Sequence, residues 1–328
     1  MPKKLLPVSV LTVAAALTLT TAPTAVAAEP HGGGGRITTA FTLPGDKVYP
    51  EGIATDPRTR AVYVGSYADG TVYRALPGRA GAEVFLPAGT DGRRTANGLR
   101  VDARGRLWVT DSTAGVTVYD TATGARLARF EVPGAGPRFV NDLTITPDGT
   151  AYLTDSVRAV VYRVTPHELT AGSGTLTPAY DLSSRLTPVP GRAFSLNGIT
   201  SDRAGRYLLT VDMIAGDLHR IDLRTGALSR VTLQGGGLVH ADGLDLAADG
   251  SLRVAHNTTN TLTRWRLTPD GTRARLVHTL TDPSLQIPTT LAHTPGRTLV
   301  VRSQFDKGGP AGGTGTPTTF TVAAVRGL

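Results

Sequence analysis

The sequence contains no cysteine, which excludes disulfide frameworks, thiolate zinc sites, iron–sulfur clusters and cysteine nucleophiles. Aromatic residues make up only 5%, and the 34 Lys and Arg residues are scattered without a basic run. The sequence therefore lacks the clustered basic and aromatic residues of a nucleic-acid-binding protein, and we expect no nucleic-acid partner. The chain also lacks a G-x-S-x-G elbow, a phosphate-binding loop, an H-E-x-x-H zinc motif and a G-x-G-x-x-G fingerprint.

Long hydrophobic runs are confined to the N-terminus. Lys3 and Lys4 precede an apolar stretch over residues 5–20, and a small-residue A-x-A pattern ends at Ala27. This order is typical of a secretory signal peptide, which we place at 1–28, followed by a flexible leader at 29–36. A membrane anchor is the competing interpretation, but the apolar run is short and is broken by Pro7. We expect a secreted protein whose mature chain has no membrane span.

The rest of the sequence is organised by an internal repeat. Six copies begin 44 to 47 residues apart, except for one interval of 56. Each copy holds about four short strands, with glycine in the turns between them. A period near 45 with four strands is typical of a β-propeller blade. We predict an all-β, six-bladed β-propeller with four-stranded blades, forming one domain over 37–328 and acting as a monomer. Ring closure is expected to pair the strand at 37–43 with the strand at 318–326.

The one long interval contains about ten additional residues within 165–195. A long insertion on one face of a propeller is a candidate lid over a binding site. An ordinary surface loop is an equally good interpretation.

Polar residues open the copies. In a propeller the first residue of each innermost strand lies at one end of the central channel, so these residues are expected to converge. They are Glu51, Asn97, Asn141, Asn197, Asp242 and Thr289. Asn, Asp and Gly also favour turns, but Glu51 is a poor turn residue. Carboxylates and amide oxygens without a cationic partner suit a divalent cation, and hard oxygen ligands favour Ca²⁺ over Zn²⁺ or Cu²⁺.

The repeated N-G-L/I-x-x-D-x-x-G-x-L-W/Y-V-T-D pattern, opened by E-G-I, resembles the senescence marker protein/gluconolactonase family over about residues 45–305. Paraoxonases and diisopropylfluorophosphatase are more distant relatives of that family. The resemblance implies a catalytic divalent ion, often Ca²⁺, held by Glu51, Asn141, Asn197 and Asp242. Asn97 occupies the equivalent place in the second blade, where it would face substrate or ligate the ion. The His dyad of paraoxonases has no counterpart in the Ala96-Asn97-Gly98 segment.

The expected activity is hydrolysis of a lactone or related ester, a small-molecule substrate. A divalent ion polarises the carbonyl oxygen, and a carboxylate beside it activates water. The resemblance gives that role to Asp242, as ligand and base or as nucleophile, while Glu51 is mainly a ligand. The alternative function is that of a non-catalytic NHL-type propeller that binds a protein or glycan.

Further polar residues end the second strands of the copies: Asp111, Asp155, Asp212 and His256. We interpret Asp111 and Asp155 as structural residues that bind loop N–H groups. His256 breaks the repeat and is equally well a substrate-binding proton shuttle or a structural residue, and His240 points either into the site or away from it. Some relatives hold a second, buried ion, for which Asp142 and Asp245 are in place, but His293 is out of register. The histidines at 167, 219, 278 and 293 lack ligand spacing and are interpreted as surface or packing residues.

Overall fold

The structure is a computed structural model that describes residues 36–328. The proposed signal peptide, 1–28, and the leader up to residue 35 lie outside the described residues. Strand β1 (Arg36–Thr42) includes Arg36, which the sequence analysis had assigned to the leader.

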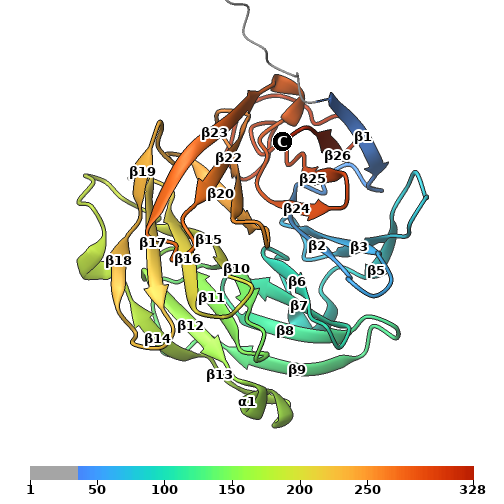
Figure 1. Ribbon diagram of the computed structural model, residues 1–328. Coiled ribbons are helices and arrows are strands. Elements are labelled where there is room, and N and C mark those ends of the chain that lie inside the picture. Colours follow the sequence, from blue (N-terminus) through green and yellow to red (C-terminus); the bar gives the residue numbers. More distant parts are fainter. Residues whose placement is uncertain (1–35) are drawn as a thin grey trace, which may run out of the picture. The chain divides into compact units, whose positions relative to one another are not determined.

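Six sheets follow one another along the chain, as the repeats predict (Figure 1). Blade 1 comprises β2 (Pro50–Thr55), β3 (Val62–Ser66), β4 (Val72–Ala75) and β5 (Glu83–Leu86). Blade 2 comprises β6 (Leu99–Val101), β7 (Arg106–Asp111), β8 (Gly115–Asp120) and β9 (Arg126–Glu131). Blade 3 comprises β10 (Val140–Ile145), β11 (Ala151–Asp155), β12 (Val160–Val164) and β14 (Thr177–Asp181).

The second half of the ring repeats this order. Blade 4 comprises β15 (Leu196–Ser201), β16 (Tyr207–Asp212), β17 (Asp217–Asp222) and β18 (Leu228–Arg230). Blade 5 comprises β20 (Ala241–Leu246), β21 (Ser251–His256), β22 (Thr261–Leu267) and β23 (Arg273–Thr281). Blade 6 comprises β24 (Leu291–Thr294), β25 (Arg297–Val301) and β26 (Thr321–Arg326), with β1 at its outer edge. The innermost strands β2, β6, β10, β15, β20 and β24 contact one another in this order, and β24 contacts β2 again.

Two of the sheets have five strands, where the sequence predicted four. Strand β13 (Ser173–Thr175) pairs parallel to β9 at the edge of blade 2, and β19 (Thr232–Gln234) pairs parallel to β23 at the edge of blade 5. Strand β13 comes from the segment between β12 and β14 of blade 3, and β19 comes from the connection between blades 4 and 5. Both cover the unpaired N–H and C=O groups of an outer strand, which would otherwise be open to pairing with another chain.

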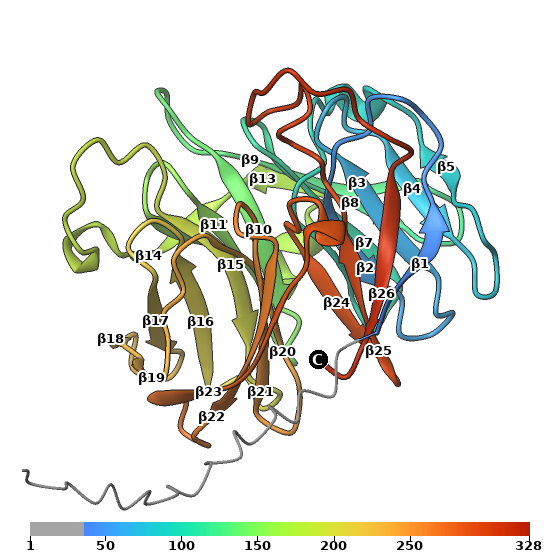
Figure 2. The same cartoon turned by 90° about the horizontal axis from the view of Figure 1, so that it is seen from above.

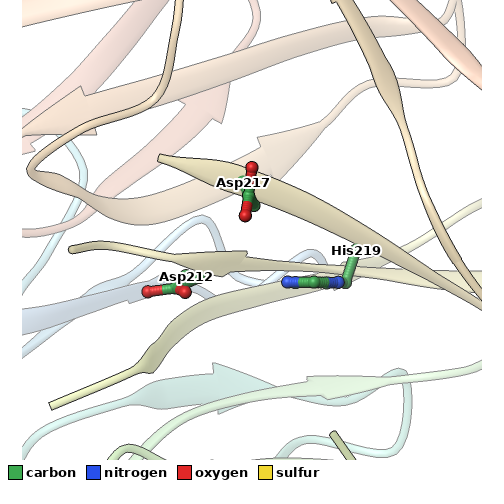
Figure 3. A group of neighbouring side chains, drawn as sticks. All are labelled: Asp212, Asp217 and His219. Carbon is green, nitrogen blue, oxygen red and sulfur yellow. The ribbon is translucent and has the colours of Figure 1, made fainter. Parts of the chain in front are cut away.

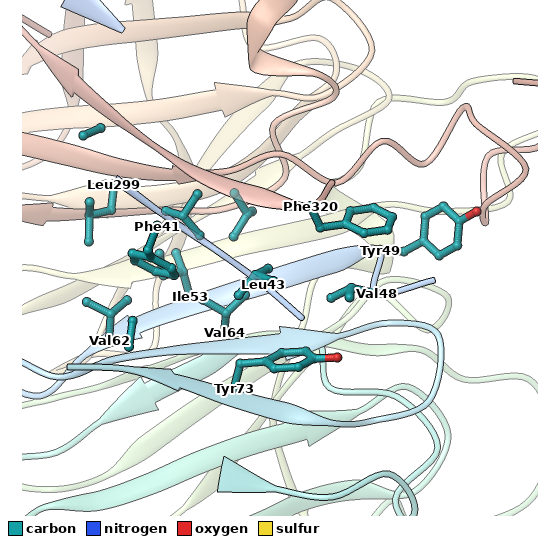
Figure 4. Packing of buried hydrophobic residues seen from close by; sticks show 14 residues of the cluster. Phe41, Leu43, Val48, Tyr49, Ile53, Val62, Val64, Tyr73, Leu299 and Phe320 are labelled. Atoms are coloured by element: carbon teal, nitrogen blue, oxygen red, sulfur yellow. The ribbon is translucent and has the colours of Figure 1, made fainter. Parts of the chain in front are cut away.

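The ring closes by pairing the two ends of the described chain, as predicted. Strand β1 runs antiparallel to β26, from Arg36 opposite Arg326 to Thr42 opposite Thr321 (Figure 2). The closing strand brings Phe41 into a buried cluster between blades 6 and 1, where it packs with Ile53 and Leu299 (Figure 4). Burying one such side chain stabilises the fold by about 1.5–3 kcal/mol. Closure therefore fixes the first blade, which carries Glu51, against the last.

Much of the insertion at 165–195 has regular secondary structure. It contains the short helix α1 (Pro166–Thr170), β13 and β14, and then the 3-10 turn η2 (Ser183–Arg185). The side chain of Thr165 accepts from the backbone of Glu168, whose side chain accepts from Thr165 in turn, so a capping box starts α1. Two further 3-10 turns, η1 (Thr90–Gly92) and η3 (Pro283–Leu285), complete the helical segments of residues 36–328. In that part of the chain, no helix has the length and apolar character needed to span a bilayer.

Candidate metal centre

Four of the predicted ligands occupy the same structural position. Glu51, Asn141, Asn197 and Asp242 are each the second residue of the innermost strand of a blade. The pairing of that strand with its neighbour shifts register at the same place in all four blades. A bulge of this kind redirects a side chain away from the regular alternation of a strand. Since each strand is the first of its blade, the four residues lie at one end of the ring.

The glycines that follow the ligands allow the inner strands to approach closely. A Cβ on Gly52 would lie 1.8 Å from the carbonyl oxygen of Asn97, and one on Gly198 would lie 2.2 Å from that of Asp242. Neither glycine has a positive φ, so the turn interpretation of the Asn-Gly pair at 197–198 does not apply. Glycine is required there because any side chain would push neighbouring blades apart.

Hydrogen bonds join the first residues of successive blades. The donors and acceptors are Gly98 N to Asn141 O (2.9 Å), Thr154 Oγ1 to Asn197 O (2.8 Å), Gly243 N to Thr289 O (2.7 Å) and Thr289 Oγ1 to Glu51 O (2.8 Å). Thr289, the opening residue of the sixth copy, therefore ties the last blade to the backbone of Glu51. The backbone of the ligand set is fixed before any ion binds.

Three side-chain oxygens of the set are buried without a hydrogen-bond partner among the described residues: Glu51 Oε2, Asn97 Oδ1 and Asn141 Oδ1. The amide of Asn97 is oriented by Val140, whose carbonyl oxygen accepts from Nδ2 at 3.2 Å. The hydroxyl of Ser156 donates to the Leu196 carbonyl and so accepts from Asn141 Nδ2 at 3.0 Å. Both amides therefore keep their oxygens free. Leaving buried acceptors unpaired costs about 1–3 kcal/mol each, a cost that a bound cation removes.

The carboxylates of the site are buried close enough to affect one another. Burial raises the pKa of Glu51 well above its ordinary value, and the charges of Asp242 and Asp142 raise it further. Burial likewise raises the pKa of Asp242 to about 7, against the lowering effect of a hydrogen bond from Asn257. The pKa of Asp142 is also raised by burial. Without a cation the site therefore resists carrying three negative charges, and a divalent ion would reverse that preference.

In blades 2 to 5, the residue that follows the second strand supports the polar side chain that opens the blade. Asn97 donates to Ser112 at 2.8 Å, Asn141 donates to Ser156, and Asn197 donates to the sulfur of Met213 at 3.3 Å. In blade 5 the direction of the hydrogen bond is reversed, because Asn257 Nδ2 donates to Asp242 Oδ2 at 2.9 Å. Sequence analysis missed Asn257. The signal was present, because Asn257 stands in the repeat column of Ser112 and Ser156.

The residues that end the second strands are structural. Asp111 Oδ1 accepts from the backbone of Thr113 and Ala114, and Asp155 Oδ1 accepts from that of Val157 and Arg158. These contacts support the structural interpretation of both aspartates.

His256 has both ring nitrogens engaged: Nδ1 lies 3.0 Å from Val239 O and Nε2 lies 2.8 Å from Thr263 Oγ1. Burial lowers the pKa of His256, which favours the neutral ring. These contacts leave no free nitrogen for the predicted proton shuttle. His240, two residues before Asp242, adopts a positive φ of 60°, so the extended backbone assumed in placing its side chain is not found there.

One group of acidic residues and histidine lies outside the central set. Ligand atoms of Asp212, Asp217 and His219 all lie within 4.8 Å of one another, and within the described chain no other group of three or more Asp, Glu, His or Cys residues is that close (Figure 3). This places His219 beside two carboxylates, which its sequence spacing did not predict.

Both carboxylates of this group already face an arginine. Arg192 Nη1 lies 2.7 Å from Asp212 Oδ1, and Arg230 Nη2 lies 3.0 Å from Asp217 Oδ2. The charges are thus balanced by the protein itself, and the central set remains the better candidate for a divalent ion.

Arginines also occupy the place considered for a second ion. Arg100 Nη2 lies 3.4 Å from Asp142 Oδ2, and Arg253 Nη1 lies 3.6 Å from Asp245 Oδ2. Burial raises the pKa of both Asp142 and Asp245, and the charge of Arg100 opposes this rise in each of them. A guanidinium therefore supplies the positive charge between these two carboxylates that a structural ion would supply.

The fold has solved counterparts. A gluconolactonase from Xanthomonas campestris matches with a TM-score of 0.61 and 19% identity, covering 89% of each chain. A luciferin-regenerating enzyme matches with a TM-score of 0.64 and 13% identity, covering 90% of this chain and 96% of that one. The chain has the gluconolactonase-type propeller fold. A virginiamycin B lyase from Staphylococcus aureus shares it too, with a TM-score of 0.55 and 13% identity over 90% of this chain and all of that one.

The comparisons establish the architecture that the sequence resemblance implied. No family model matches the chain, and no curated protein matches it. Because hydrolases and a lyase share this fold, the activity has to be argued from the site.

Proposed function

We propose that the chain is a secreted, Ca²⁺-dependent hydrolase of a lactone or related ester. The observation that carries the proposal is the set of buried oxygens without partners in the described structure, on Glu51, Asn97 and Asn141, next to the buried carboxylate of Asp242. Purely structural polar residues of a propeller are expected to be satisfied within the blades. The gluconolactonase-type fold supports the reaction class.

Glu51, Asn141, Asn197 and Asp242 would hold the ion, with Asn97 beside them. All five offer oxygen atoms, which suit Ca²⁺ and its six to eight hard ligands. The two carboxylates Glu51 and Asp242 supply two negative charges, which one divalent ion balances. When bound, the ion polarises the carbonyl oxygen of the substrate and stabilises the charge that develops on it.

Asp242 serves as the general base. Asn257 Nδ2 holds Oδ2 of this carboxylate, so Oδ1 is the atom that takes a proton from water as the water oxygen bonds to the carbonyl carbon. The ring C–O bond then breaks, and the proton passes from Asp242 to the alkoxide that leaves. The products are an alcohol and a carboxylic acid, which releases the second proton of the water to solvent as it ionises, so the step needs no redox partner.

The test compares Glu51→Gln with Glu83→Gln. Both variants replace a blade 1 carboxylate by its amide, but Glu83 is exposed and paired with Arg74 at 2.6 Å. We expect wild type and Glu83→Gln to bind Ca²⁺ and hydrolyse a lactone, and Glu51→Gln to lose affinity by on the order of 100-fold or more. Calorimetry measures the affinity. Unchanged Ca²⁺ binding in Glu51→Gln would refute the ligand assignment. Ca²⁺ binding without turnover of any lactone or ester would favour the binding-propeller alternative.

Secretion rests on the first 28 residues and is tested separately. When the full-length gene is expressed in a secreting host, mass spectrometry of the protein in the medium should show an N-terminus close to residue 29. An intact N-terminus on protein retained in cells would contradict this part of the proposal.

A further inference from the structure

Four aromatic side chains form a continuous row at the ligand end of the ring. Phe305, Tyr67, Phe139 and Phe194 follow one another with ring-centroid distances of 5.6, 6.3 and 5.2 Å. Tyr67 and Phe139 stack with 24° between their planes, while Phe139 and Phe194 meet edge to face. In a chain with only 5% aromatic residues, such a row indicates a binding surface and not general core packing.

The row borders the proposed metal centre. Phe139 precedes Asn141 by two residues, and Phe194 precedes Asn197 by three. Burial and then the charge of Glu51 raise the pKa of Tyr67, and the nearby side chain of Ser112 opposes this rise. The phenol of Tyr67 therefore lies close to both the Glu51 carboxylate and the serine that orients Asn97.

The row also crosses one blade. Tyr67 belongs to blade 1 and Phe139 to blade 3, so their contact spans the end of blade 2. Blade 2 places the small residue Ala96, which is fully buried, directly before Asn97.

The loop that presents Phe139 is held by arginines. Arg158 donates to the carbonyl oxygens of residues 133, 135, 136 and 137, and Arg138 donates to those of residues 113 and 134. These guanidinium groups are therefore engaged with the loop backbone and not offered to a ligand. The loop fixes the position of Phe139, so binding against it requires little ordering.

Apolar groups on the neighbouring loops remain exposed. Phe194 is 38% exposed, Val157 is 39% exposed and Val239 is 47% exposed. They belong to loops that lead to or from the ligand end of blades 3, 4 and 5. Such a grouping beside polar ligands matches the usual composition of a small-molecule site, with an apolar wall and few polar contacts.

We propose that this aromatic row binds an alkyl or aryl substituent of the substrate, so that the enzyme prefers apolar lactones to polyhydroxylated sugar lactones. The inference rests on the proposed hydrolase function and names the substrate class of the same site. The reacting carbonyl group would lie at the oxygen ligands, and the substituent would cover Phe139 and Phe194. Each methylene that the row buries strengthens binding by about 0.8 kcal/mol, or roughly fourfold.

The test uses three lactones with the same six-membered ring: δ-undecalactone, δ-valerolactone and glucono-δ-lactone. We expect kcat/KM of the Ca²⁺-loaded enzyme for δ-undecalactone to exceed that for each of the other two at least tenfold. Phe139→Ala and Phe194→Ala should each lower the ratio of kcat/KM for δ-undecalactone to that for δ-valerolactone towards one, because the row contacts only the substituent. Phe85→Ala is the matched control, since Phe85 packs on Tyr63 in the outer part of blade 1. Equal kcat/KM for the three lactones, or a preference for glucono-δ-lactone, would overturn the inference.

A binding measurement separates failure of this inference from failure of the proposed function. Non-hydrolysable 6-hexylpiperidin-2-one and piperidin-2-one are titrated into wild type and Phe139→Ala by calorimetry. If no lactone is hydrolysed but the hexyl compound binds at least tenfold tighter, and only when Phe139 is present, the hydrolase proposal fails and the apolar site stands. Equal affinities of the two compounds would refute the apolar site, whether or not the protein is a hydrolase.

Discussion

The central ligand set and the blade 4 group are built from similar side chains but differ in charge balance. Arg192 and Arg230 neutralise Asp212 and Asp217 in the blade 4 group, and each contact uses one oxygen of the carboxylate. In the central set, Glu51 and Asp242 raise each other's cost of ionisation, and a buried oxygen of Glu51 has no partner within residues 36–328. Proximity of acidic residues is thus a poor guide to a metal site, whereas uncompensated charge on buried oxygens is a better one.

The blade 4 group also lacks a hydrogen bond that the equivalent residues of blades 3 and 5 make. In blade 3 the residue equivalent to His219 is Tyr162, whose hydroxyl donates to Asp155 Oδ2 at 3.1 Å, and in blade 5 it is Thr263, 2.8 Å from His256 Nε2. In blade 4 His219 Nε2 and Asp212 Oδ2 are buried, and neither has a hydrogen-bond partner in the described structure. Figure 3 shows the nitrogen end of the imidazole turned towards Asp212 across a gap. Arg192 and the backbone N–H groups of Ile214 and Ala215 therefore hold Asp212, and the histidine does not.

Replacing Arg192 by methionine should leave the negative charge of Asp212 without a cationic partner, as in the central set. Asp212 is fully buried, so loss of its partner should cost about 3–5 kcal/mol of unfolding free energy. Chemical denaturation measures the loss. Arg206→Met is the matched control, because Arg206 pairs with Asp202 at 2.7 Å but is 59% exposed, and its loss should cost much less than that of Arg192. Similar losses in the two variants would show that Arg192 does not compensate a buried charge.

Arg192→Met also tests whether charge balance or geometry keeps metal ions out of the blade 4 group. If charge balance decides where a cation binds, millimolar Zn²⁺ should stabilise Arg192→Met but not Arg192→Met combined with Asp212→Asn. A failure of Zn²⁺ to distinguish them would mean that geometry, and not charge, excludes metal from blade 4.

The central set can be disturbed from the backbone without altering any ligand. In Gly198→Ala the new Cβ would lie 2.2 Å from the carbonyl oxygen of Asp242, so blades 4 and 5 must separate by enough to displace Asp242. We expect Ca²⁺ affinity to fall about 10- to 100-fold, with a loss of roughly 1–3 kcal/mol in stability from the overpacking. Gly237→Ala is the control, since the structure places nothing within 4 Å of its Cβ. Wild-type Ca²⁺ affinity in Gly198→Ala would show that close approach of the blades does not position the ligands.

The period of the sequence was sufficient to predict the ring, its closure and the positions of the first residues of the blades. These features depend on patterns that recur six times, so each copy supports the others. Strands β13 and β19 could not be predicted, because each is three residues long and its partner is an outer strand of a different blade. The insertion shows the same limit in part, since β14 pairs with the preceding strand β12 of its own blade, whereas β13 pairs with the distant strand β9.

The candidate site was predictable only where the repeat is strict. Glu51 and Asp242 could be proposed because they stand in the column that opens each copy, whereas Asn257 was missed because its column lies just after the end of the repeated pattern. The aromatic row could not be found at all. Tyr67 and Phe139 lie 72 positions apart in the sequence, and only the ring brings them together. The ion pairs at Asp142 and Asp245 could not be predicted either. Arg100 reaches Asp142 from a different blade, and Arg253 reaches Asp245 from the other strand of the same hairpin.

The smallest expected effect concerns the protonation of His219. Burial lowers its pKa; Asp217 and Asp212 oppose this effect, while Arg230 and Arg192 reinforce it. The unfolded chain therefore binds the proton more readily, so this contribution to stability is present above the unfolded pKa of about 6.5 and is lost as the pH falls through and below it. His219→Gln should flatten the fall in stability between pH 6.5 and 5, as measured by urea denaturation at each pH, while the same change at the exposed His167 should not. An unaltered slope in His219→Gln would place the acid sensitivity elsewhere, and would mean that the two arginines and two aspartates around His219 leave its protonation unchanged on folding.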